Sequence, residues 1–477
     1  MMALRSIRKR ETREPPQSLV NRSTAEPIEP SNELTERPTR VRYGVLAFLC
    51  SLCFVLYLDR LCMGVAKVPM QEELGFTNTQ LGMIDLAFMI SYAVFEMPVG
   101  NWGDRFGSRG VLTRIVLCWS LFTALTGTMS SLWPLLAVRF LFGAGEAGAF
   151  PNAARVLTRW FPGPSRVQAQ SMVTAFAQLG GAVSPIMAGY ISTWFGWRWS
   201  FAFFGAVGVV WAVAFYMWFR DNPAEHPGVN SAELKMLAAS APAANHEQHP
   251  PLPWRAILTN ANVWLLGIAM NCGAATFYMC VYWFPKYLKA ARGVELVNSG
   301  WLSSLINVGG AIGCIAGALI SNWLIDRIPD RGTVRRLVGG GGFAAAAFCV
   351  FMIVHSDSPV AASIFSGLAI MCGQIQITSW WAVTAEISGK HQGALFGLMN
   401  SMGGIGGGLS PYFFGWFGDW MGRRGHTGRD QWDPAFYVYV GVYLVGVVCW
   451  RFIDASRSIE DRENRPQDAP PDSTTVA

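Results

Sequence analysis

Charge is scarce in this sequence. Only 14% of the 477 residues are Asp, Glu, Lys or Arg, whereas an ordinary soluble domain has about 25%. Too little polar surface is available for a soluble enzyme of this size, and the composition also excludes a disordered chain and a secreted disulfide scaffold. Hydrophobic residues are abundant instead, at 52%, with 20 Trp and 30 Phe. This balance predicts a protein that spans a membrane several times.

Signals for targeting, metals and catalysis are also missing. Residues 1–42 contain no apolar stretch of the kind found in a signal peptide, and their mix of Pro, Arg and Glu predicts a disordered tail. The six His show no metal-ligand spacing, and Cys50 and Cys53 form a C-x-x-C without a second pair, which is typical of buried helix residues. With no P-loop and no HExxH, we expect no cofactor and no metal, and an enzyme is the least favoured class. The net charge of +6 gives no reason to expect nucleic-acid binding.

Apolar runs of about 18–28 residues recur along the chain. A backbone in lipid must satisfy its own hydrogen bonds, and these runs are too long for barrel strands, so each run predicts a helix. The predicted fold is an all-α membrane protein with twelve transmembrane helices. The predicted spans are 43–66, 81–103, 111–129, 132–155, 167–193, 199–219, 262–287, 299–325, 335–354, 360–387, 393–417 and 435–453.

An internal repeat divides these spans into two groups of six. The pattern GxxSPxxxG occurs at 181–189 and again at 407–415, an offset of 226 residues, and a second pair of matching segments lies at 101–105 and 322–327. Parallel repeats of this kind predict two pseudo-symmetric six-helix halves with a substrate site between them near the membrane midplane. The predicted divisions are a disordered cytoplasmic tail at 1–42, a first half at 43–220, a cytoplasmic linker at 221–260, a second half at 261–453 and a disordered cytoplasmic tail at 454–477.

Basic residues flank the first and the last predicted span. An even number of spans places both tails on one side, and the positive-inside tendency predicts that this side is the cytoplasm. We therefore expect a multi-pass protein of the plasma (inner) membrane, in contact with the lipid bilayer. The flanking residues are Arg37, Arg40, Arg42, Arg451, Arg457, Arg462 and Arg465.

A glycine-rich basic loop, GNWGDRFGSR, follows the second predicted span at 100–109. It resembles the hallmark loop of the major facilitator superfamily, and the resemblance implies a conformational latch on the inner side of the membrane. The matching positions are Gly100, Asp104, Arg105, Gly107 and Arg109. A degenerate copy in the second half supplies Asp326 and Arg327.

Charged residues within the spans gather in the first half. Charge inside a membrane is costly and usually functional, whereas 299–325, 337–353 and 358–385 carry no formal charge. We therefore expect ion coupling and anion recognition to depend on the first half. The charged residues in its spans include Asp59, Arg60, Asp85, Glu96, Arg114, Arg139 and Glu146.

These residue types permit proton-coupled transport of an anion. An arginine stays charged and presents a planar fork that fits a carboxylate, and a carboxyl group in a low-dielectric site can exchange a proton near neutral pH. Arg139 and Glu146 lie seven residues apart, two turns along one helix face. We expect protonation of Glu146 to free Arg139 for an anion.

The sequences YLDR at 57–60, RFLFGAGEAGAFP at 139–151 and GWRWSF at 196–201 resemble the anion:cation symporter family of the facilitator superfamily, over residues 43–453. This family includes sugar-acid, phthalate, tartrate and vesicular glutamate transporters. By resemblance, Arg60 grips the substrate carboxylate, Asp59 and Glu146 handle protons, and Arg139 is linked to both. The remaining implied pocket residues are Tyr57, Tyr92, Gln178, Trp381 and Asn400.

Span two departs from the family pattern, because Asp85 and Glu96 stand where neutral residues are more usual. Each of the two is either a further proton-coupling group or a structural charge. The resemblance also implies a monomer.

We expect proton-coupled symport of a small organic anion by alternating access. The anion is expected to be a sugar acid such as a hexonate, hexuronate or glucarate, or another carboxylate. An organic-anion exchanger or exporter is an alternative within transport. A non-transporting membrane sensor built on the same fold is an alternative of another class.

Overall fold

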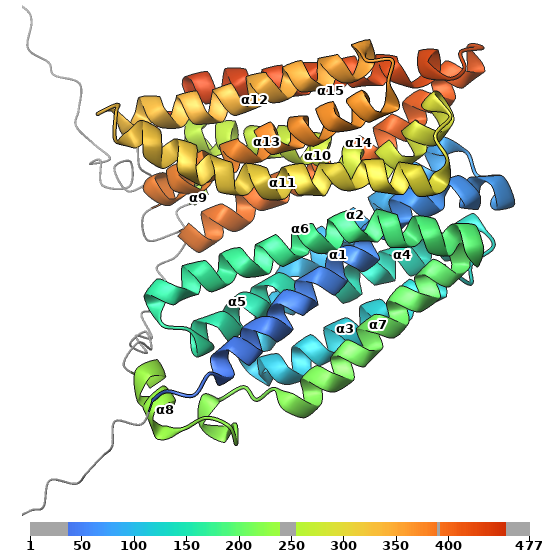
Figure 1. Ribbon diagram of the computed structural model, residues 1–477. Coiled ribbons are helices and arrows are strands. Elements are labelled where there is room, and N and C mark those ends of the chain that lie inside the picture. Colours follow the sequence, from blue (N-terminus) through green and yellow to red (C-terminus); the bar gives the residue numbers. More distant parts are fainter. Residues whose placement is uncertain (1–36, 239–253, 389–391, 455–477) are drawn as a thin grey trace, which may run out of the picture.

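The computed structural model describes residues 37–238, 254–388 and 392–454, and the regular elements within these ranges are all helices. Two groups of long helices are stacked one on the other (Figure 1). The helices are α1 (Val41–Leu74), α2 (Asn78–Phe106), α3 (Ser108–Thr126), α4 (Leu132–Glu146), α5 (Ala149–Trp160), α6 (Gly163–Trp194), α7 (Trp197–Trp218), α8 (Ser231–Ala238), α9 (Trp254–Thr259), α10 (Ala261–Arg292), α11 (Leu296–Ile325), α12 (Arg331–His355), α13 (Pro359–Ser388), α14 (Gln392–Arg423) and α15 (Arg429–Phe452), with a 3-10 turn at Pro223–Glu225.

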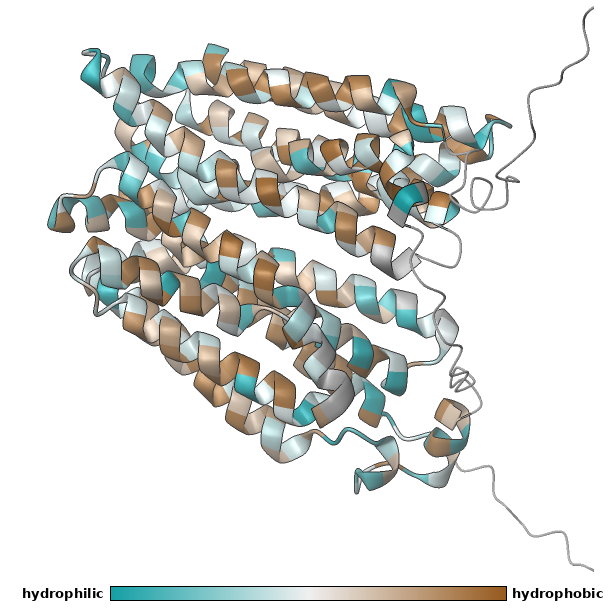
Figure 2. Cartoon of the chain, turned by 180° about the vertical axis from the view of Figure 1, so that it is seen from behind, coloured by the Kyte–Doolittle hydropathy of each residue, from teal (hydrophilic) through white to brown (hydrophobic). Residues whose placement is uncertain are grey.

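The long helices make twelve membrane crossings in the part of the chain that the structure describes. Nine of them are long and apolar enough to cross a membrane on their own: α1, α3, α6, α7, α10, α11, α12, α13 and α15. α2 and α14, of 29 and 32 residues, pack against each other, and α4 with α5 makes the remaining crossing. Hydrophobic residues predominate along these helices (Figure 2). The predicted all-α fold of two six-helix halves is confirmed.

One predicted span is interrupted. The expected continuous helix at 132–155 is instead α4 and α5, separated at Ala147 and Gly148. Gly148 has a φ of +83°, which a residue with a side chain rarely adopts. The expectation of an unbroken helix was therefore wrong, because the left-handed Gly148 interrupts the helix just after Glu146.

Much of the predicted tails and linker falls on residues 1–36, 239–253 and 455–477, which lie outside the described residues. In the described part of the linker, α8 is tied to the start of α1. Arg42 Nη1 lies 3.0 Å from Oε1 of the buried Glu233, and the Thr39 hydroxyl donates to the same carboxylate. The residues just before the first crossing are thus held against the linker.

A short turn joins α1 to α2. Gly75 ends α1 in the left-handed conformation with a φ of 69°, and Thr77 and Gln80 form a capping box at the start of α2. We call this end of the bundle the opposite side. The tail side is the end at which α1 begins and α15 ends.

The repeated Ser-Pro pattern makes the same contact in each half. The Ser184 hydroxyl on α6 donates to the Leu58 carbonyl on α1, and the Ser410 hydroxyl on α14 donates to the Ala275 carbonyl on α10, both at 2.6 Å. Each serine therefore joins its proline-containing helix to the first helix of its own half.

The prolines after these serines lie where the two halves meet. A Cβ on Gly300 of α11 would lie 2.4 Å from the Pro185 carbonyl oxygen, and a Cβ on Gly82 of α2 would lie 3.0 Å from the Pro411 carbonyl oxygen. Glycine at both positions lets the helix pairs α6 with α11 and α2 with α14 pack closely. The halves are closest toward the opposite side and diverge toward the tail side (Figure 1).

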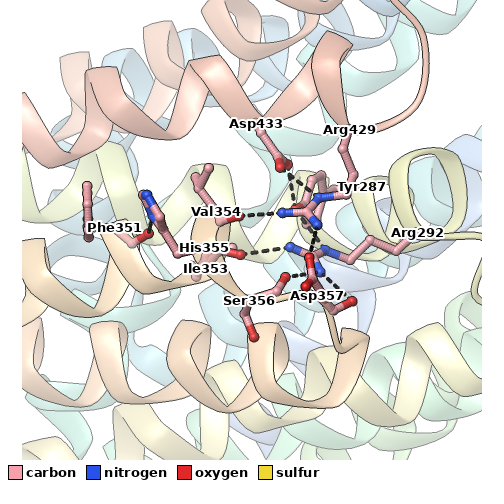
Figure 3. Close-up of polar contacts among 10 residues, drawn as sticks. All are labelled: Tyr287, Arg292, Phe351, Ile353, Val354, His355, Ser356, Asp357, Arg429 and Asp433. Atoms are coloured by element: carbon pink, nitrogen blue, oxygen red, sulfur yellow. Dashed lines mark hydrogen bonds and ion pairs between the residues drawn. The ribbon is translucent and has the colours of Figure 1, made fainter.

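Two arginines close the opposite-side end of α12 (Figure 3). Arg292 donates to the carbonyls of Ile353 at 2.7 Å and Ser356 at 2.6 Å, and Arg429 donates to the Val354 carbonyl. The last carbonyls of a helix have no partner within it, so these arginines satisfy the end of α12 and join it to α10 and α15.

Candidate substrate and proton site

Arg60 and Glu146 form an ion pair in the interior of the first half. Both Nε and Nη2 of Arg60 donate to Oε1 of Glu146, at 2.8 and 2.5 Å. Arg60 is 3% exposed and Glu146 is fully buried. Glu146 Oε2 has no hydrogen-bond partner within the described residues. The pair is charge-assisted and shielded from solvent, so either partner is costly to leave alone.

The interruption between α4 and α5 places Glu146 at the last residue of α4. Gly148 packs so closely on α2 that an added Cβ would lie 2.7 Å from Val99 Cγ1. Asn152 on α5 donates back to the Gly148 carbonyl at 2.8 Å. Glycine and a local side-chain hydrogen bond thus shape the turn that follows the acidic residue.

Aromatic rings surround the Arg60 guanidinium. Its Cζ lies 4.7 Å from the ring centre of Tyr92, 5.2 Å from that of Phe88 and 5.5 Å from that of Tyr57. These distances allow cation–π attraction in a site that excludes water. Two of the predicted pocket residues, Tyr57 and Tyr92, therefore lie beside Arg60.

Arg60 also reaches across to the second half. Its Nη1 donates to the Tyr278 hydroxyl on α10 at 3.4 Å. Tyr278 was not identified from the sequence, where it is one aromatic residue among many in an apolar run. Its position makes it the link between the ion pair and the second half.

Arg139 does not pair with Glu146 as the sequence suggested. All three guanidinium nitrogens of Arg139 are buried without a hydrogen-bond partner in the described residues, and its Cζ lies 4.3 Å from the ring centre of Phe142. Glu146 instead bonds Arg60 through Oε1, and its Oε2 has no hydrogen-bond partner in the described residues, so Arg139 makes no direct contact with it. The residue in direct contact with Glu146 is Arg60 and not Arg139. That protonation of Glu146 frees Arg139 for an anion stays a prediction.

Asp59 lies in the same interior as Arg139. It is 1% exposed, and neither of its carboxylate oxygens has a hydrogen-bond partner in the described part of the chain. The charges of Arg139 and Glu146 both act on it. Two acids and two arginines therefore share one interior, with a direct contact between Arg60 and Glu146.

A cavity of about 150 Å³ lies in the second half beside Tyr278. It is mainly apolar, with Gln374 and Gln376 as its amide groups. The Gln376 Oε1 is buried without a hydrogen-bond partner in the described residues. The full lining is Met270, Gly273, Ala274, Phe277, Tyr278, Ile370, Gly373, Gln374, Gln376, Ile377 and Tyr443.

The remaining predicted pocket residues do not line this cavity. Gln178 is buried on α6, with its Nε2 close to Gly310 of the second half. Trp381 is half exposed and stacks on Phe396 at 3.9 Å between ring centres. Asn400 is partly buried on α14.

Span two carries one paired acid and one that is partly buried. Asp85 is fully buried and forms an ion pair with Lys67, which is also fully buried. Glu96 is partly buried, one turn beyond Tyr92 on α2. Lys67 was missed because the predicted first span ended at residue 66, whereas α1 continues to Leu74.

The described contacts of the loop after α2 join it to α7 and to Asp221, at the start of the linker. Gly107 has a φ of +81°, and the N–H groups of Ser108 and Arg109 donate to Asp221 Oδ1 at 2.7 and 3.0 Å. The Arg109 guanidinium donates to the Tyr216 carbonyl at 2.9 and 2.5 Å. Asp221, which was not identified from the sequence, therefore caps the start of α3.

The other predicted latch residues are placed as follows. Gly100 faces Pro151, the nearest atom to an added Cβ being 3.2 Å away. Asp326 follows the end of α11, and Arg327 Cζ lies 3.8 Å from the ring centre of Trp323. The side chains of Asp104 and Arg105 lie outside the described residues.

Relatives of the chain are transporters. It is 29% identical over 426 residues to the probable sulfoacetate transporter SauU of Cupriavidus necator, covering 89% of this chain and 97% of the relative. It is also 29% identical over 436 residues to the probable galactarate/D-glucarate transporter GudP of Escherichia coli, covering 87% and 94% of the two chains.

Solved structures share the fold. A bacterial homolog of the human lysosomal transporter Spinster, in an inward-facing and occupied conformation, superposes with a TM-score of 0.71 at 18% identity, covering 87% of this chain and 97% of the other. The D-xylose-proton symporter superposes with a TM-score of 0.64 at 14% identity, covering 87% and 98%. The sequence model of the Major Facilitator Superfamily matches residues 49–384. The chain therefore belongs to the Major Facilitator Superfamily and is a membrane transporter, not an enzyme.

Proposed function

We propose that the protein is a proton-coupled symporter of a small organic anion that works by alternating access. The anion is a sugar acid, such as a hexonate, hexuronate or glucarate, or another carboxylate. The observation that carries this proposal is the buried Arg60–Glu146 ion pair, in which one arginine is held by one acid and also touches Tyr278 of the second half.

In the proposed cycle, protonation of Glu146 and binding of the anion to Arg60 occur together. While Glu146 is ionised, its Oε1 occupies two of the Arg60 donors. Protonation removes the negative charge and leaves a buried guanidinium that favours a new anionic partner. By linkage, bound anion equally favours the protonated acid. Release of the anion on the other side then lets Glu146 lose its proton and recapture Arg60.

Asp59 and Arg139 are proposed to complete the charge balance. Both are buried, and neither has a hydrogen-bond partner among the described residues. Buried charges that lack direct partners depend on the protonation of their neighbours. We propose that Asp59 handles a proton in the same cycle, beside the positive charge of Arg139.

The names of the relatives support an organic anion. Sulfoacetate, galactarate and D-glucarate are all small acids with at least two anionic groups. The mainly apolar cavity beside Tyr278, with Gln374 and Gln376 in its lining, is small and offers hydrogen bonds to hydroxyl groups. A compact hydroxylated acid suits a positive Arg60 on one side and amide groups on the other.

The deciding experiment is uptake of labelled D-glucarate, sulfoacetate and a panel of hexonates and hexuronates into vesicles that contain the purified protein. We expect an imposed pH gradient, acidic outside, to drive accumulation above equilibrium. Transport of no member of the panel, or equal transport with and without the gradient, contradicts the proposal. Counterflow that needs no gradient identifies an exchanger, and binding without flux identifies a sensor.

We also propose that the protein is a monomer in the plasma (inner) membrane with both tails in the cytoplasm. The basic residues that flank the first and last spans support this orientation. A reporter enzyme that is active only in the cytoplasm, fused after residue 477, should be active. Activity only when the reporter is fused within the turn Gly75–Thr77 contradicts the orientation.

A further inference from the structure

A second pair of buried cations lies toward the opposite side, away from Arg60. Lys67 on α1 is fully buried and Lys286 on α10 is 3% exposed. Both approach one indole, because Nζ of Lys67 lies 4.3 Å and Nζ of Lys286 lies 5.2 Å from the ring centre of Trp283. The first half and the second half each contribute one lysine.

The two lysines differ in how their charge is balanced. Lys67 forms an ion pair with Asp85 of its own half. Lys286 donates to Asn78 of the other half, an amide that in turn donates to Asp419 at 2.8 Å. No carboxylate in the described residues forms an ion pair with Lys286, although the charges of Asp419 and Asp85 act on it from further away. A buried ammonium without a direct anionic partner is costly, so Lys286 is the better candidate for an anion-binding group.

Contacts between the halves hold both lysines in this closed arrangement. Lys67 Nζ donates to the Tyr282 carbonyl at 3.1 Å, and Lys286 donates to Asn78 across the same boundary. When the halves separate on the opposite side, each lysine loses an acceptor and gains access to solvent. The Tyr282 hydroxyl and the Trp283 Nε1 are also buried without hydrogen-bond partners in the described part of the chain.

The lysines also lie on the path toward Arg60. Lys67 is seven residues beyond Arg60 on α1, which places it on the same helix face and about 10 Å nearer the opposite side. Lys286 is six residues from the end of α10. An anion that approaches from the opposite side therefore meets the lysines before it meets Arg60.

We propose that Lys286, assisted by Lys67, forms a separate subsite for a carboxylate or sulfonate when the opposite side is open. The anion binds there first and then moves to Arg60. As the halves close, Lys286 bonds Asn78 again and Lys67 bonds the Tyr282 carbonyl again. The anion then has no partner left at the lysines. This inference rests on the proposed transport of organic anions and adds a first binding step to it.

The test measures binding of D-glucarate by calorimetry in a protein whose opposite side cannot close. Gly300→Trp should block closure, because even a Cβ there would lie 2.4 Å from the Pro185 carbonyl. Arg60→Ala in the same chain removes the main site. Gly82→Trp, at the related contact on α2, serves as a second lock should Gly300→Trp not fold.

In the locked Arg60→Ala protein we expect weak residual binding, with a dissociation constant of about 1 mM. Lys286→Gln should lower this affinity at least tenfold, as expected for loss of one charge-assisted hydrogen bond, and Lys286→Arg should retain it. The matched control is Lys289→Gln, which removes an exposed lysine one turn further along α10 and should change nothing.

Two outcomes overturn the inference: no residual binding in either locked protein, or residual binding that Lys286→Gln leaves unchanged. A different result contradicts the proposed function itself. In that case the locked protein with Arg60 intact binds neither D-glucarate nor sulfoacetate, and vesicles with the wild-type protein transport neither.

Discussion

Glu146 holds Arg60 through a single oxygen. Oε1 accepts both hydrogen bonds, at 2.8 and 2.5 Å, whereas Oε2 has no partner within the described residues. A proton can therefore be added at Oε2 without first breaking the contact with Arg60. The arrangement separates the place where the proton arrives from the place where the arginine is held.

Glu146→Gln should uncouple transport from protons. The amide keeps the shape of the side chain and one oxygen acceptor but cannot ionise, so it resembles the protonated acid. We expect counterflow of D-glucarate within about threefold of wild type and no accumulation driven by a pH gradient. Retained accumulation in vesicles would show that another acid carries the proton.

Arg60→Ala should abolish anion binding at the main site. Its two donors to Glu146 are the ones proposed to turn to the substrate, and the loss of two charge-assisted hydrogen bonds weakens binding about 100-fold or more. Calorimetry with D-glucarate measures the effect. Arg60→Lys is the companion variant: it keeps the charge but lacks the planar fork, so binding should be intermediate. Equal and mild effects of Arg60→Ala and Glu146→Gln would contradict the division of roles.

Asp419→Ala should loosen the closure on the opposite side. Asp419 on α14 accepts the N–H groups of Asn78 at 3.1 Å and Thr79 at 2.7 Å, and so caps α2 of the other half. Loss of a cap costs about 1 kcal/mol, which is about a fivefold shift toward the open state. The measurement is labelling of a cysteine introduced at Leu86, whose side chain lies against Gly408 across the boundary.

The rate of that labelling by a membrane-impermeant reagent should rise about fivefold, as read by peptide mass spectrometry. Asp430→Ala is the control, because Asp430 is an exposed acid on the same side. A rate equal to that of the control would show that the cap does not hold the halves together.

Gly148→Ala should destabilise the protein. At a φ of +83° an alanine is strained by about 1–2 kcal/mol, and its Cβ would press on Val99. Gly110→Ala on α3 is the matched control, since nothing lies within 4 Å of an added Cβ there and alanine favours a helix. We expect the midpoint of thermal unfolding to fall for Gly148→Ala and to stay constant or rise for Gly110→Ala. Equal midpoints would mean that the turn after Glu146 relaxes freely.

The crossings and their symmetry were predictable, because each depends on local sequence. The lengths of the hydrophobic runs predicted the spans, but the observed helix ends differ from the predicted ones. The span predicted at 299–325, for example, begins at Leu296, shortly after Gly293 ends α10. The repeated Ser-Pro pattern gave the division into halves. Its physical basis is visible at Ser184 and Ser410, which make equivalent hydrogen bonds.

The pairing of charges was not predictable, because it depends on how helices face one another. Arg139 and Glu146 share one helix and suggested a pair, but Arg60 from α1 reaches Glu146 instead. The turn at Gly148 was hidden for a similar reason, since a glycine in an apolar run fits close helix packing as well as a left-handed turn. Lys286 was overlooked as a residue near the end of a span, although it is 3% exposed.

The two contacts of a proline carbonyl with a glycine, Pro185 with Gly300 and Pro411 with Gly82, lie at pseudo-equivalent positions of the repeat. They are therefore two symmetry-related pivot contacts, one on each side of the molecule, about which one half can rotate relative to the other. A bulky side chain at one of these two contacts would hinder the rotation and also change the direction of its axis. The rate of transport can therefore change through substitution of these two glycines, while the residues that bind the anion stay the same.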